Sequence, residues 1–150
     1  MKLKRTIISI VALMLAVCLM PTALAATWYL EDGDITVIAD ENGQSVKQGN
    51  NDAVADSDTV ITQRDSEKAT DNTITVSTTD DATANITIED VNINSYGDAI
   101  DVGSSGANIT LEGDNKLNSE YGSGLHVSAG DVTLTGSGSQ EAGSKHASNN

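Results

Sequence analysis

The chain has 150 residues, and its 22 acidic residues outnumber its 8 basic ones, which gives a net charge of −14. This acid excess argues against nucleic acid and anionic membrane surfaces as partners, because both carry negative charge themselves. Only 3% of the residues are aromatic and none is Phe, which excludes a core built on large rings and leaves Ile, Val and Leu to fill a narrow interior.

The first 25 residues have the pattern of a secretory signal peptide. Three basic residues precede an apolar run from Ile7 to Met20, and Ala23-Leu24-Ala25 supplies small residues for cleavage. The run is shorter than the roughly 20 residues that span a bilayer, so a permanent membrane anchor fits less well. We therefore expect a secreted or cell-surface bacterial protein that begins near Ala26 and is not inserted in a membrane after cleavage. Loss of the three basic residues would change the net charge from −14 to −17.

The only cysteine, Cys18, lies within this predicted signal peptide. The residues Leu15-Ala16-Val17 before it resemble a bacterial lipoprotein box, but Val17 stands where a small residue is expected, so we do not expect lipidation. The mature chain would then have no thiol for a disulfide or for a thiolate metal site.

Two short apolar segments follow the predicted cleavage site, from Trp28 to Leu30 and from Gly33 to Ile38, and they indicate a first pair of strands. An exposed Trp can stack on a sugar ring, but a Trp beside the first strand of a repeat more often covers the open end of the core, and we expect that role for Trp28. From Asp40 to Asp58 the sequence is rich in Asn, Gly, Asp and Gln, which predicts an irregular loop.

Beyond residue 58, short segments in which apolar and polar residues alternate recur at a nearly constant interval. Alternation with a period of two indicates β-strands that are buried on one side. One pattern begins at Asn85, Asn108 and Asp131, in steps of 23 residues, and a second passes through Ile74, Ile100 and Leu125, in steps of 26 and 25. The predicted strands are 59–62, 73–76, 85–88, 91–93, 99–102, 108–111, 116–117, 124–127 and 131–134.

Three short strands in each interval of 23 to 26 residues, separated by Gly, Asn, Asp and Ser, predict an all-β fold, a right-handed parallel β-helix of about four coils over residues 26–136. Stacking would align like residues at about 4.8 Å. The expected interior columns are Ile86/Ile109/Val132 and Ile74/Ile100/Leu125, and the expected turn ladder is Asn85/Asn108/Asp131. Residues 137–150 are polar, which predicts a disordered tail or the start of further sequence.

Candidate sites for chemistry are sparse in this sequence. Asp98, Asp101 and Asp114 lie in the repeats, and the basic residues that would support catalysis are few, so we do not expect an enzyme. Calcium is the metal that these carboxylates would take, although the acidity can equally serve solubility, and Gly97 and Gly122 can simply turn the chain. One 25-residue step separates Asp101 from His126, which places them on neighbouring coils. With one histidine in the repeats, a transition-metal site is not expected.

The segments Gly97-Asp98-Ala99-Ile100, Asn108 to Gly113 and Gly122 to Val127 resemble the carbohydrate-binding β-helix domains of secreted Gram-positive bacterial proteins, and more distantly the pectate-lyase-type β-helix. The resemblance implies non-catalytic binding of plant or cell-wall polysaccharide, with calcium in some members. Asp98 and Asp101 are the matched positions, while the basic residues of the related lyases are missing.

Two classes of function therefore stay open. The first is a polysaccharide-binding module, whose ligand-binding residues would be Tyr96, Tyr121 and His126. The second is a structural spacer or adhesin stalk without its own ligand. A fragment of a polysaccharide lyase or hydrolase fits the sequence less well than either.

Overall fold

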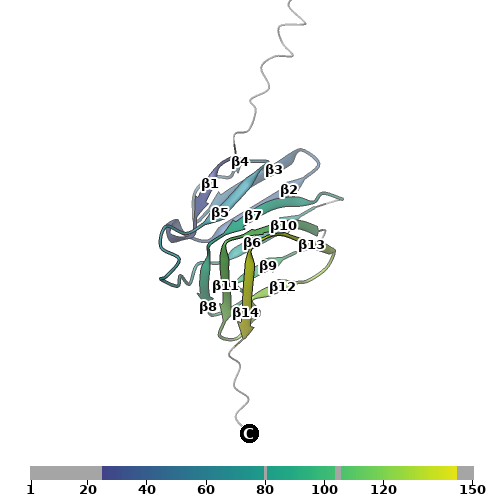
Figure 1. Ribbon diagram of the computed structural model, residues 1–150. Coiled ribbons are helices and arrows are strands. Elements are labelled where there is room, and N and C mark those ends of the chain that lie inside the picture. The colour runs from purple at the N-terminus through teal and green to yellow at the C-terminus, as the bar shows by residue number, and fades with distance from the viewer. Residues whose placement is uncertain (1–24, 80, 104–105, 145–150) are drawn as a thin grey trace, which may run out of the picture.

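A computed structural model describes residues 25–79, 81–103 and 106–144, and the predicted signal peptide before Ala25 lies outside the described residues. The described chain is a β-solenoid, in which three mostly parallel sheets surround one apolar core (Figure 1). Its one helical element is a single 3₁₀ turn, η1 (Leu30–Asp32). Within the described residues, no helix is long and apolar enough to cross a membrane.

Each sheet collects the corresponding strands of successive turns. Sheet A is parallel throughout, sheet B is parallel except for β3 and β4, and sheet C has a further parallel bridge between Thr70 and Ile93. In spatial order, sheet A contains β1 (Thr27–Tyr29), β5 (Thr59–Thr62), β7 (Ala84–Glu89), β10 (Gly106–Glu112) and β13 (Asp131–Gly136); sheet B contains β12 (Leu125–Val127), β9 (Ile100–Val102), β6 (Ile74–Thr78), β2 (Ile35–Asp40), β3 (Gly43–Gln48) and β4 (Val54–Ala55); and sheet C contains β14 (Ser139–Ser144), β11 (Asp114–Ser119) and β8 (Asn92–Ser95).

About three turns are complete, and a partial turn lies at each end, where the sequence predicts about four coils. The turns β7-β8-β9 and β10-β11-β12 each contribute one strand to every sheet. The turn before them contains β5 and β6. At its sheet C position there is a single residue, Thr70, which forms the bridge with Ile93. In the turns β7-β8-β9 and β10-β11-β12, each sheet is thus extended by one strand per turn.

The predicted alternation decides which side chains fill the core. In β7 and β10, Ile86 and Ile109 are buried and pair with one another, and Ile88 pairs with Leu111 in the same way. In sheet B, Ile74, Ile100 and Leu125 pair in sequence, which confirms the second predicted column. Since apolar burial contributes about 25 cal/mol per Å² of surface removed from water, these columns are the main source of stability.

The first predicted column is wrong in its last member. Ile109 pairs with Leu134, 25 residues later, while Val132 pairs with Ala107. The register changes because two corners of this turn are each one residue longer than in the turn before. Two residues lie between the equivalent paired positions of β7 and β8, but three lie between those of β10 and β11. In the same way, four residues lie between the paired positions of β8 and β9, but five lie between those of β11 and β12.

The predicted turn ladder is also displaced. Asn85 and Asn108 lie inside strands and are joined by a 2.9 Å hydrogen bond from Asn108 Nδ2 to Asn85 Oδ1, but Asp131 pairs with Gly106 instead. The corner ladder is formed one strand later: the Asp114 N–H donates to Asp90 Oδ1 at 2.9 Å, and the Ser139 hydroxyl donates to Asp114 Oδ1 at 2.7 Å. Asp90 takes a left-handed φ of 50°, a conformation that aspartate tolerates better than most residues.

The segment from Asp40 to Asp58 is more ordered than predicted. It contains β3 and β4, which extend sheet B in antiparallel fashion from β2. β1 and β2 do not pair with each other, contrary to the expectation of a first strand pair, because they belong to sheets A and B. Trp28 packs against the core as expected of a cap, and its Nε1 donates to Asp56 Oδ2 at 2.7 Å.

The strand pattern continues beyond the predicted boundary at residue 136. β14 pairs with β11 over six residue pairs, from Asp114 with Ser139 to Ser119 with Ser144. Its mostly polar residues form a strand because β11 offers them a complete row of backbone partners. The last layer is nevertheless open, since 46% of Leu134 is exposed to solvent. Residues 145–150 of the predicted tail lie outside the described part of the chain.

Candidate functional site

Tyr96 and Tyr121 form a tilted aromatic pair at the corner between sheets C and B. Tyr96 follows β8 and Tyr121 follows β11, and the Tyr121 N–H donates to the Tyr96 carbonyl at 3.0 Å. The ring centroids are 4.6 Å apart with the planes inclined by 46°. The two residues are 72% and 58% exposed, respectively. Stacking on successive turns has therefore assembled a solvent-facing aromatic surface from single residues.

The outer face of sheet C leads up to this tyrosine pair and is polar throughout. Strand alternation turns Ile93 and Leu117 into the core and leaves the intervening side chains outside. Lys116 pairs with Asn92 on one side and with Glu141 on the other. The outward-facing residues of this sheet are Asn92, Asn94, Asp114, Lys116, Asn118, Ser139 and Glu141.

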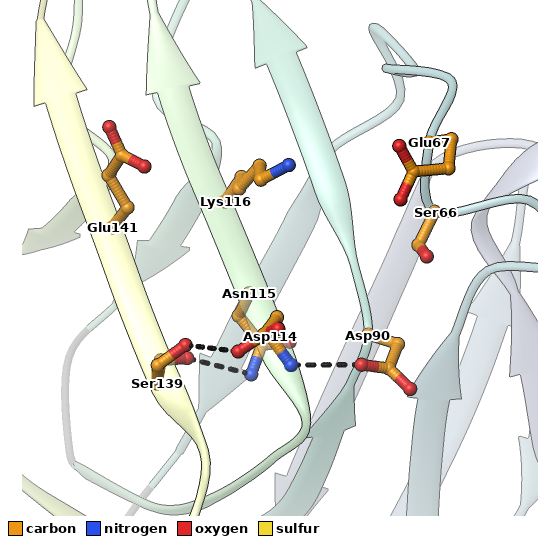
Figure 2. A pocket seen from close by; sticks show the side chains of 8 residues that line it. All are labelled: Ser66, Glu67, Asp90, Asp114, Asn115, Lys116, Ser139 and Glu141. Carbon is orange, nitrogen blue, oxygen red and sulfur yellow. Dashed lines mark hydrogen bonds between the residues drawn. The ribbon is translucent and has the colours of Figure 1, made fainter.

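A shallow pocket of about 330 Å³ lies over the start of this face (Figure 2). Figure 2 shows Lys116 and Glu141 standing on neighbouring strands, with Glu67 on a loop on the far side of the next strand. Asn115 lies beneath the pocket and is buried; its Oδ1 accepts the Val91 N–H at 3.2 Å and its Nδ2 donates to the Glu112 carbonyl at 3.0 Å. The buried amide thus fixes the corner that supports the outer face.

Asp98, Asp101 and His126 converge on the other side of the tyrosine corner. His126 pairs with Asp101 in the register of β12 and β9, as the 25-residue step predicts. His126 Nδ1 lies 3.0 Å from Asp101 Oδ1 and 3.4 Å from Asp98 Oδ2. Asp98 Oδ1 accepts the Ser123 N–H at 2.6 Å. The arrangement supplies two carboxylates and one imidazole within reach of solvent.

Asp114 does not join this group. It lies at the start of β11, where its carboxylate accepts the Ser139 hydroxyl and its N–H donates to Asp90. Among the described residues, the cluster whose ligand atoms all lie within 4.8 Å of one another consists of Asp98, Asp101 and His126. Two of the three predicted calcium ligands therefore come together, with an imidazole as the third group. Calcium itself stays a prediction.

Arg64 lies at the N-terminal turns, away from these groups, and its side chain contacts Asp32 and Tyr29. Its guanidinium donates to both carboxylate oxygens of Asp32, at 2.9 and 2.7 Å, and its Cζ lies 4.0 Å from the centroid of the Tyr29 ring. The hydrogen bonds from Arg64 hold the pKa of Asp32 below its usual value. Both groups are exposed, so this ion pair contributes little to stability.

Sequence reasoning singled out the tyrosines and Asp98, Asp101 and His126, but it missed the outer face of sheet C and Asn115. The alternation in Asn92-Ile93-Asn94-Ser95 and Lys116-Leu117-Asn118-Ser119 carries the signal for that face, because every second residue is polar and points outward. Asn115 carries no such signal, since its polar side chain is buried by a corner. No known family, curated protein or solved structure matches the chain in the comparisons made.

Proposed function

We propose that the protein is a secreted or cell-surface module that binds a plant or cell-wall polysaccharide without chemically changing it. The observation that carries the proposal is the exposed pair of Tyr96 and Tyr121 rings at the end of the polar outer face of sheet C. His126 lies on β12, on the other side of the tyrosine corner.

The chemistry of a polysaccharide matches this combination of surfaces. Each sugar ring presents apolar C–H groups on its faces and hydroxyl groups around its edge, so it is recognised by an aromatic ring together with hydrogen-bonding side chains. A tyrosine supplies an apolar face and a hydroxyl on one rigid side chain. Along sheet C, Asn92, Asn94 and Asn118 supply amides that can both donate and accept. An extended chain lying along the sheet could contact both at once.

Binding fits the site better than catalysis. General acid and base chemistry requires carboxylates held in a cleft in contrasting environments. Here Asp98 and Asp101 are part-exposed and both face the same imidazole, while Asp114 faces the Ser139 hydroxyl. The outer face of sheet C is shallow and open, a shape that suits a bound chain more than an enclosed reaction.

Retention on insoluble polysaccharides tests this proposal. We expect the purified protein to sediment with at least one of cellulose, pectin and peptidoglycan. Replacing both Tyr96 and Tyr121 by Ala should weaken binding about tenfold or more, because aromatic residues at the centre of a binding surface each contribute on the order of 1 to 2 kcal/mol. The matched control is Tyr29→Ala, since the third tyrosine lies beside Arg64 at the N-terminal turns and should leave retention unchanged.

The alternative is a spacer or adhesin stalk that binds nothing itself. If a correctly folded protein is retained on none of the three polysaccharides, the spacer is favoured and the binding proposal fails. If the double variant and wild type are retained equally, binding is real but the tyrosine pair is not its centre. Release of shortened sugar chains during the assay would instead indicate a lyase or hydrolase.

A further inference from the structure

We propose that Asp98, Asp101 and His126 bind one divalent transition-metal ion of the zinc class, and that this ion ties two successive turns of the solenoid together. The proposal goes beyond polysaccharide binding and does not rest on it. Asp98 and Asp101 come from the turn that contains β9, and His126 comes from the following turn, on β12.

The distances in this cluster are close to those of a coordination sphere. Zinc binds imidazole nitrogen and carboxylate oxygen at about 2.0 to 2.2 Å in tetrahedral geometry, which sets neighbouring ligand atoms about 3.3 to 3.6 Å apart. His126 Nδ1 lies 3.4 Å from Asp98 Oδ2 and 3.0 Å from Asp101 Oδ1. All three ligand atoms lie within 4.8 Å of one another. Side-chain rotations that move these three atoms by a few tenths of an ångström to about one ångström would place all of them at ligand distance from a single ion.

The backbone holds these ligands in place independently of any ion. His126 and Asp101 are directly paired in the parallel register of β12 and β9. Asp98 Oδ1 accepts the Ser123 N–H at 2.6 Å, which orients the carboxylate and leaves Oδ2 directed at the imidazole. Hydrogen bonds of this kind to the second oxygen of a ligating carboxylate are typical of metal sites.

The ligand set selects the class of ion. Calcium and magnesium take six or more oxygen ligands and are poorly served by an imidazole nitrogen. Nitrogen together with carboxylate oxygen suits zinc and its neighbours in the first transition series. The carboxylates contribute a charge of −2 that an ion of charge +2 neutralises. The three side chains are 30%, 42% and 47% exposed for Asp98, Asp101 and His126, so the ion can enter and water can complete its coordination.

Titration of the tag-free full chain with zinc chloride, followed by calorimetry and by thermal unfolding, tests the proposal. We expect one ion per chain and a rise in Tm of about 5 °C or more when zinc is in large excess over its dissociation constant. His126→Asn should weaken binding at least about tenfold and abolish the rise in Tm. The matched control is His146→Asn, the other histidine of the chain, which should behave as wild type.

Calcium and magnesium at the same concentration separate the site from general charge screening. We expect neither ion to reproduce the effect of zinc. An equal rise in Tm with calcium would overturn the proposal in favour of calcium at the same carboxylates. An equal rise with zinc in wild type and His126→Asn would overturn it as well, because the ion would then bind elsewhere. Asp98→Asn and Asp101→Asn must each weaken binding, and an unchanged affinity in both would remove the carboxylates from the ligand set.

Discussion

Replacing Ile109 by Asp is expected to lower the free energy of unfolding by at least about 4 kcal/mol, because it places a charge without a partner in the centre of the core. Ile109 is 1% exposed and lies in β10 between Ile86 and Leu134 on the neighbouring turns. The buried side chains of this core are apolar and leave a carboxylate without a compensating partner. Urea unfolding followed by circular dichroism measures the loss.

The control is the next residue along the same strand. The side chain of Thr110 points outward, where its hydroxyl is 3.3 Å from that of Thr135. Thr110→Asp should therefore change the free energy of unfolding by about 1 kcal/mol or less. Equal shifts of the unfolding midpoint in the two variants would contradict the alternation on which the core depends.

Gly122→Ala is expected to cost about 2 to 3 kcal/mol, by overpacking a corner that has no space for one more carbon. A Cβ at Gly122 would lie 2.6 Å from the backbone nitrogen of Asp98 and 2.7 Å from the carbonyl carbon of Gly97. Both are backbone atoms of the turn below, which cannot rotate away as the end of a side chain would. The same unfolding experiment measures the effect.

The equivalent glycine one turn earlier provides a matched control. Gly97 follows Tyr96 as Gly122 follows Tyr121, but a Cβ at Gly97 would meet nothing within 4 Å. Gly97→Ala should leave stability within about 1 kcal/mol of wild type. If both substitutions cost the same, the loss at Gly122 would come from the chemistry of glycine in a turn and not from contact between turns. Because Asp98 lies against Gly122, the Gly122 variant should also bind zinc less tightly.

The sequence was sufficient to predict the fold class, because its alternating segments report directly which side chains enter the core. Ile74, Ile100 and Leu125 share a column since the steps between them span whole turns. The pairing of Asp101 with His126 follows from the same step. Counting histidines argued against a transition metal, but the count could not show that two carboxylates are turned toward the one imidazole.

Corners were the part of the fold that the sequence could not place. The 23-residue step from Asn108 to Asp131 is a repetition of the sequence and not of the structure, because two longer corners move Leu134, and not Val132, above Ile109. A polar corner residue has no periodicity to reveal whether it bulges or pairs. In the same way, β14 consists mostly of polar residues, and only the presence of β11 beside it makes that segment a strand.

The stacking of turns also has a consequence for the order in which the chain assembles. Partners lie 23 residues apart for Ile86 and Ile109 and 39 apart for Ile35 and Ile74, where the β3–β4 hairpin intervenes. The entropy of closing a loop grows only with the logarithm of its length, so this difference amounts to about 0.5 kcal/mol. The length of chain between partners therefore barely favours any one pair of turns as the place where folding starts. The apolar surface that two turns bury against each other matters more. Ile86 with Ile109 and Ile88 with Leu111 form buried pairs of this kind, and a pair of turns that buries enough apolar surface provides the template to which further layers add.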